Sequence, residues 1–87
     1  MKVAYEKARL MALWQKIFEA TTFEERCDVV QEMSTQDRAM IFLHEEDGEW
    51  FIKGVDGLNS ENEARYLREW AEMRKIEEAK GNLPYAG

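Results

Sequence analysis

The chain has 87 residues, enough for one domain and too few for two, and 45% of them are hydrophobic while 34% are charged. Its three Trp, four Phe and three Tyr argue against a disordered protein, and its single cysteine excludes an intramolecular disulfide and hence a secreted disulfide scaffold. The formal net charge is −6, and ten acidic residues outnumber three basic ones over residues 21–60. This acidity disfavours direct binding to nucleic acid or to an anionic membrane.

The composition predicts a mostly α-helical protein. Five glycines and one proline are few for a sheet-rich fold of this size, which needs more turn residues. The longest apolar runs, 10–14 and 39–43, are far shorter than the roughly 20 residues of a membrane span, and the start of the chain carries no apolar signal core. We therefore expect a cytoplasmic protein with a single helical domain over residues 1–80 and a flexible C-terminal tail over residues 81–87.

Residues 2–20 are predicted to form a long amphipathic helix. Leu10, Trp14 and Ile17 recur at helical spacing on one face. The apolar arc widens between Leu10 and Phe18, so this half of the helix is expected to have neighbours on two sides.

Two short helices are expected next, over about 23–33 and about 35–45. Thr22 and Glu25 fit a capping box at the start of the first of them. Ser34 fits the N-cap of the second. Because a single serine separates the two helices, they should form a tight elbow.

The segment 41–53 has two interpretations. An Asp-Gly pair between apolar runs is typical of a β-hairpin turn. In such a hairpin, however, Glu46 would lie opposite Glu49, and like charges across a hairpin destabilise it. We favour a helix through about Glu45, an exposed acidic turn and a short extended piece over 49–53, with a minor β-hairpin as the alternative.

The last helix is predicted over residues 61 to about 80. Ser60 and Glu63 fit a capping box at its start, and Gly81 fits the C′ position at its end. Few apolar residues follow Met73, so the last two turns are expected to project beyond the core. The predicted fold is thus a small helical bundle of two long and two short helices.

No residue pattern in the sequence specifies a reaction, so we predict that the chain is not an enzyme and has no catalytic site, metal site or cofactor. A Cys27–His44 pair is conceivable, but a thiol on the apolar face of a short helix is usually a small core residue. The acidic stretch around His44 matches neither the ligand spacing of a calcium loop nor the ligand set of a zinc site. The two serines, Ser34 and Ser60, are better explained as helix caps.

Two features are candidate contact surfaces for a partner protein. Clustered carboxylates can occupy a basic groove that was built for phosphates. In the apolar run that begins at Trp50, a strand would turn at least one side chain outward, and exposed aromatic residues are frequent interface anchors. The predicted partner-binding residues are Glu45, Glu46, Asp47, Glu49, Trp50, Phe51 and Asp56.

The predicted function is that of a small acidic regulatory or accessory module that docks on a partner protein. In size and charge the chain resembles many small accessory or inhibitor proteins, including those of phages, a resemblance that assigns no site residues. Two alternatives stay open. One is an inhibitor that mimics nucleic acid and blocks the basic groove of a nucleic-acid-binding protein. The other is a structural subunit that self-associates, as a homodimer, through the wide apolar arc of the first helix. Trp14, Tyr66 and Trp70 are expected to be core residues.

Overall fold

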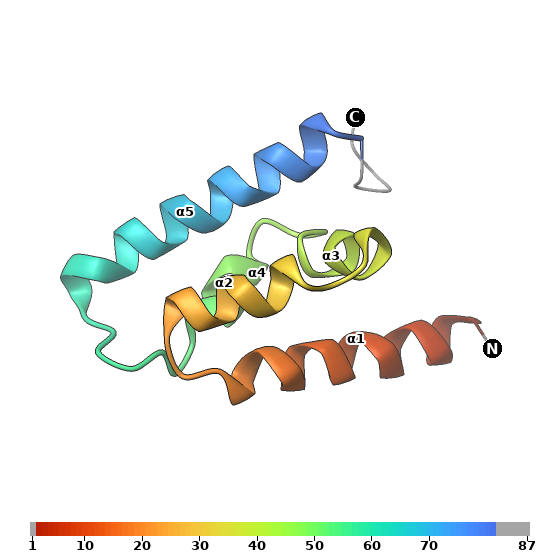
Figure 1. Ribbon diagram of the computed structural model, residues 1–87, viewed down its shortest axis with the longest axis horizontal. Helices are drawn as coiled ribbons and strands as arrows, with labels where there is room; N and C mark the ends of the chain where they lie inside the picture. Colours follow the sequence, from red (N-terminus) through yellow and green to blue (C-terminus); the bar gives the residue numbers. More distant parts are fainter. Residues whose placement is uncertain (1, 82–87) are drawn as a thin grey trace.

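The computed structural model describes the backbone of residues 2–81 and the side chains of residues 7–81, and this part of the chain forms five helices. The two long helices lie on the outside, and the three short ones lie between them (Figure 1). In chain order the helices are α1 Lys2–Glu19, α2 Phe23–Gln31, α3 Thr35–Ile41, α4 Asp47–Ile52 and α5 Ser60–Ala79. The predicted small, mostly helical bundle is confirmed, with one more short helix than expected.

Aromatic side chains from the short helices and α5 form the centre of the core. The ring centroid of Phe51 lies 5.8 Å from that of Phe23 and 4.9 Å from that of Trp70. Phe23 also stacks on Tyr66 at 4.3 Å, and Phe42 meets Trp70 at 4.6 Å. Tyr66 and Trp70 are therefore core residues, as predicted, and each such buried ring contributes about 1.5–3 kcal/mol.

Thr22 and Ser34 are the N-caps of α2 and α3, as predicted. The side-chain oxygen of Thr22 accepts a hydrogen bond from the backbone N–H of Glu25 at 3.1 Å. That of Ser34 accepts from the backbone N–H of Asp37 at 3.2 Å. Both bonds satisfy backbone donors that the first helical turn leaves without an intrahelical partner.

The start of α5 differs from the prediction by one residue, because Asn59 and not Ser60 is the N-cap. The Asn59 side-chain oxygen accepts from the backbone N–H groups of Glu61 and Asn62, at 2.9 and 3.0 Å. The Asn62 side chain returns the bond by accepting from the Asn59 N–H at 2.8 Å. Asparagine caps as well as serine does, so the capping box predicted for Ser60 and Glu63 was wrong in register.

The end of α5 confirms one prediction and corrects another. Gly81 adopts a φ of +75° just after the helix, as expected at the C′ position. The last two turns, however, do not simply project from the core. Glu77 is buried there, and its carboxylate lies 2.6 Å from Nε of Arg38. A charged residue can pack inward when an opposite charge meets it, which a count of apolar residues misses. The predicted tail beyond Gly81 lies outside the described residues.

The favoured interpretation of segment 41–53 was correct only for the exposed acidic turn, at Glu45 and Glu46, and the β-hairpin alternative was wrong. Helix α3 ends at Ile41, before the predicted Glu45, and residues 47–52 form a helix instead of an extended piece or a hairpin. The buried residues of this helix are Gly48, Phe51 and Ile52. Their three- and four-residue spacing is that of a helix face against a neighbour, here α5.

Gly48 explains how α4 comes to lie so close to α5. A Cβ atom at this position would lie 2.5 Å from Cδ1 of Trp70. Only glycine lets the indole ring pack directly on the helix backbone. The Asp-Gly pair therefore serves a close contact between helices, and this is why it misled the hairpin interpretation.

Arg26 links the ends of two helices from inside the core. Its Nε donates to the carbonyl oxygen of Ala20 at 2.9 Å, just after α1. Its Nη1 donates to the carbonyl oxygens of Phe51 and Lys53, at 2.8 and 2.7 Å, at the end of α4. The last carbonyls of a helix lack intrahelical donors, and the forked guanidinium supplies them at both sites.

Two further arginines hold α3 in place. Arg74 of α5 donates to the carbonyl oxygens of Phe42 and Leu43, at 2.7 and 3.0 Å, just beyond the end of α3. Arg9 of α1 makes a bidentate ion pair with Asp37 in the first turn of α3, at 2.8 and 2.7 Å. Helix α3 is thus bonded to both outer helices.

Candidate functional site

Helix α1 uses only one side to build the core. Leu13 and Ile17 are buried, and α1 packs against α2 and α3. On the other side, Met11 is 64% exposed and Phe18 is 37% exposed. Helices α2 and α3 are neighbours of the kind that the wide apolar arc predicts, but they leave Met11 and Phe18 exposed. This leaves an apolar helix face in contact with solvent.

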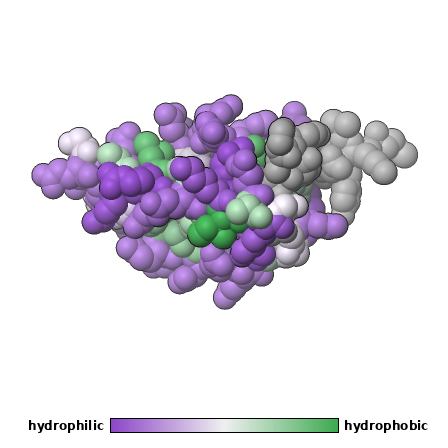
Figure 2. Space-filling model, turned by 90° about the horizontal axis from the view of Figure 1, so that it is seen from above, coloured by the Kyte–Doolittle hydropathy of each residue, from purple (hydrophilic) through white to green (hydrophobic). Residues whose placement is uncertain are grey.

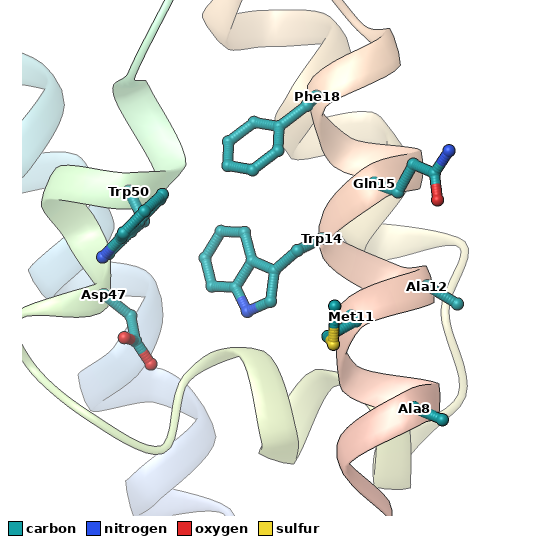
Figure 3. Close-up of a pocket in the computed structure, with 8 residues that line it drawn as sticks. All are labelled: Ala8, Met11, Ala12, Trp14, Gln15, Phe18, Asp47 and Trp50. Atoms are coloured by element: carbon teal, nitrogen blue, oxygen red, sulfur yellow. The ribbon is translucent and has the colours of Figure 1, made fainter.

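A groove of about 790 Å³ lies between this face of α1 and helix α4. Trp14 and Phe18 extend from α1 toward Trp50 of α4, so that aromatic rings stand on both sides of it (Figure 3). We call it the aromatic groove. Its lining residues are Ala8, Met11, Ala12, Trp14, Gln15, Phe18, Asp47 and Trp50.

The three rings of the aromatic groove contact one another and two cations. Trp14 stacks on Phe18 with a centroid distance of 5.8 Å, and Phe18 lies 6.4 Å from Trp50. The Arg26 guanidinium lies 5.4 Å from the ring centre of Phe18, and the Lys53 ammonium 4.6 Å from that of Trp50. Cation–π contacts of this kind stabilise a ring orientation. These contacts favour the observed orientations of Phe18 and Trp50.

The predicted site residues Trp50 and Phe51 point in different directions. Trp50 is 53% exposed and lines the groove, whereas Phe51 is fully buried among core rings. Consecutive residues of a helix are turned by about 100°, so one can face a groove while the next faces the core. One outward aromatic residue was expected from strand alternation, but the helix is what turns Trp50 outward. Phe51 offers no surface for a partner.

The predicted acidic residues separate into three groups. Asp47 lines the aromatic groove, and burial raises its pKa despite the opposing charge of His44. The neighbouring carboxylates stay in solvent: Glu45, Glu46 and Glu49 are exposed, and Glu45 makes a long 3.7 Å ion pair with Arg74.

Asp56 lies apart from the groove, in the loop before α5. Its backbone N–H donates to the carbonyl oxygen of Thr21 at 2.7 Å. Burial lowers the pKa of Arg26, and the charge of Asp56 acts in the opposite direction by raising it. Of the predicted site residues, the structure therefore brings Asp47 and Trp50 together and places Asp56 beside a structural arginine.

The only cysteine is poorly suited to act as a nucleophile. Cys27 is half-buried, and burial, followed by the charges of Glu69, Asp28 and Glu24, raises its pKa to about 11. The thiol is then almost wholly protonated at neutral pH, and the reactive form of cysteine is the thiolate. Within the side chains that the structure describes, no three His, Cys, Asp or Glu residues are grouped so as to hold a metal ion.

The sequence prediction missed the α1 half of the groove. Trp14 was expected in the core, but it is half-buried and lines the groove. Met11 and Phe18 were noted only as parts of a wide apolar arc. That arc was the available signal, because it carries more apolar residues than one packed face of a helix needs.

Comparison of the chain with protein-family models, with curated proteins and with solved structures finds no match. In residues 2–81, no helix combines the length and apolar character that crossing a bilayer requires.

Proposed function

We propose that this chain is a small protein-binding accessory module, and that the aromatic groove is its contact surface. The observation that carries the proposal is the clustering of exposed apolar side chains. Met11, Phe18 and Trp50 all line the groove, whereas the fourth large exposed apolar residue in the described chain, Ile76, lies on α5. Contiguous exposed apolar surface of this kind is typical of protein–protein contact sites.

The composition and rigidity of the groove also support binding to a protein. Tryptophan is among the residues that contribute most at interfaces, and methionine adapts its shape to a partner. Each square ångström of apolar surface removed from water contributes about 25 cal/mol. Because Arg26 and Lys53 contact two of the three rings, Phe18 and Trp50, less side-chain ordering opposes binding at these rings.

The proposal involves binding without a catalytic step. The groove is lined by apolar residues, one amide and one carboxylate, Asp47, and it offers no nucleophile–base pair of the kind that acyl transfer needs. The single cysteine of the chain favours a cytoplasmic setting, which we include in the proposal.

Photocrosslinking from the α1 wall of the groove tests the proposal. A photoreactive amino acid would replace Gln15, which is exposed and lines the groove, and the control would carry it at Glu72, which is exposed on α5. We expect discrete protein adducts from position 15 in cells that express the chain, and none of these from position 72. Adding Trp50→Ala to the position-15 variant should remove them. The same adducts from both positions, or none from position 15, would contradict the proposal.

The alternative, a nucleic-acid mimic, draws on exposed carboxylates outside the groove. Glu45, Glu46 and Glu49 share one turn and the following helix, and spaced carboxylates can replace phosphates in a basic groove. Salt distinguishes the two candidates. Binding through charge should weaken steeply between 50 and 500 mM salt, roughly the range where the Debye length falls below 10 Å, whereas binding through the aromatic groove should change little.

A further inference from the structure

We infer that the occupant of the aromatic groove is a second copy of this chain, bound through an antiparallel pairing of the two α1 helices. This inference rests on the proposed function, because it names the partner of the same groove. In a two-fold dimer each copy uses the same surface. The surface must therefore contain both a groove and the element that fills it, and α1 supplies both.

The shape of α1 suits close pairing of two copies. Ala8 and Ala12 are exposed beside the groove, four residues apart and so on one face of the helix. Small residues let a second helix approach closely. Met11, also exposed, extends from the same face and is long enough to enter the partner's groove between Trp14 and Trp50. Helix α1 thus presents two small residues and one flexible apolar side chain on the same face.

The charge distribution also favours a second copy. Residues 1–20 carry four basic and two acidic residues, whereas residues 21–60 carry three basic and ten acidic ones. Arg9 is paired with Asp37 of its own chain. Lys7 and Lys16 are exposed basic side chains that α1 of a second copy brings toward Asp47 and Glu46. Opposite charges favour encounter of the two surfaces.

The helix dipole of α1 selects the direction of the pairing. A parallel pair would place like ends of the two dipoles together. An antiparallel pair about an axis near Ala12 brings the start of each helix toward the end of the other.

Analytical ultracentrifugation of the wild type and two matched variants tests the dimer. Met11→Glu places a charge on the α1 face, and Ile76→Glu places the same charge at a residue of α5 with similar exposure, 54% against 64%. We expect the wild type to sediment at twice the monomer mass of 10.3 kDa and Ile76→Glu to do the same. Met11→Glu should raise the dissociation constant by about 30-fold or more, as loss of an interface anchor does. Far-UV circular dichroism would show that both variants stay folded.

Disulfide crosslinking provides a second readout that does not depend on destabilising the interface. Ala12→Cys lies near the proposed two-fold axis, and Ala71→Cys, on the exposed side of α5, is its matched control. Mild oxidation should crosslink two copies through position 12 and not through position 71. The wild type gives the background from Cys27, which is half-buried.

Three outcomes would overturn the dimer: a wild type that stays monomeric up to millimolar concentration, a Met11→Glu variant that stays dimeric, or equal crosslinking through positions 12 and 71. The Gln15 photocrosslinks separate this failure from failure of the proposed function. Adducts with a different protein, from a monomeric chain, would reject the second copy and keep the groove as a binding site. The absence of any adduct, including one of twice the monomer mass, would reject both.

Discussion

The contact of α3 with α5 and the contact of α1 with α4 are built from different chemistry. Between α3 and α5, Arg38 pairs with the buried Glu77, and Arg74 binds the carbonyl oxygens that follow α3. Between α1 and α4, the rings of Phe18 and Trp50 approach to 6.4 Å beside a groove. The α3–α5 contact is made by directional polar bonds, whereas the α1–α4 contact is apolar and partly exposed to solvent.

The outer surfaces of α5 and α1 also differ in hydropathy. Viewed from the α5 side, the molecule is mostly hydrophilic, with hydrophobic colour confined to small areas (Figure 2). The α1 side carries Met11 and Phe18 in solvent next to Trp50. The polar groups of the α3–α5 contact are already hydrogen-bonded within the chain. The exposed rings of the α1–α4 contact still have apolar surface whose removal from water would be favourable. The α3–α5 contact therefore adds directional bonds to the core, and the open α1–α4 groove is consistent with the proposal that it is the binding surface.

Breaking the α3–α5 ion pair should have the largest effect. Arg38→Met leaves the buried carboxylate of Glu77 without its arginine and should lower the free energy of unfolding by about 3 kcal/mol. Adding Glu77→Leu removes the buried charge and should recover most of the loss. Urea unfolding of the two single variants and the double variant measures this coupling. Equal stability of Arg38→Met and the double variant would show that the pair contributes nothing specific.

Filling the close contact of α4 with α5 should have the next largest effect. In Gly48→Ala the new methyl group meets the ring of Trp70, which is buried and has no room to move away. Overpacking of this kind costs about 1–3 kcal/mol. Gly57→Ala is the comparison, because a Cβ there meets no atom within 4 Å and only its φ of +75° opposes it. A thermal melt of each should show the larger decrease for Gly48→Ala.

Acid should weaken the link between α1 and α3. Hydrogen bonding from Arg9 lowers the pKa of Asp37 in the folded protein. The stabilising contribution of this carboxylate is therefore complete above its unfolded pKa of about 3.9 and is lost as the pH falls below that value. In urea titrations between pH 6 and pH 2.5, Asp37→Asn should show a smaller acid-induced loss than the wild type. Parallel curves for the two proteins would contradict the assignment.

Changing the open contact should affect stability least. Trp50→Ala removes a half-exposed ring and its contacts with Phe18 and Lys53, and at protein concentrations where the chain is monomeric it should cost about 1 kcal/mol or less. The photocrosslinks from position 15 should nevertheless disappear. A variant that unfolds would instead make Trp50 a structural residue and remove the main support for the binding proposal.

Local signals in the sequence predicted the local features of the fold. The caps at Thr22 and Ser34 and the glycine after α5 depend on a few adjacent residues, so they could be identified without a structure. Helix α4 could not, because its helical form depends on Trp70, which lies 22 positions after Gly48 and covers it. Glu77 was missed for the same reason, since its burial requires Arg38 from another helix.

The candidate site was predictable in part. Trp50 and Asp47 were identified from the composition of one segment, and both line the groove. Met11 and Phe18 were not, because an apolar residue on a wide arc is expected to be buried until the neighbouring helices are known. Phe51, adjacent to Trp50, was assigned to the surface and lies in the core. Trp50 and Phe51 are adjacent in a helix, so one is exposed and the other is buried. The expectation of an extended segment did not identify which of the two faces the core.

The position of Arg26 has a consequence for how the groove moves. One guanidinium bonds to the end of α1 and to the end of α4, and these are the two helices whose side chains form the walls. Arg26 therefore couples the two walls, and its hydrogen bonds oppose a change in the width of the groove. Lysine at this position would lack the fork that reaches both helix ends. Under the proposed function, Arg26, which does not line the groove, would set the spacing that a partner must match.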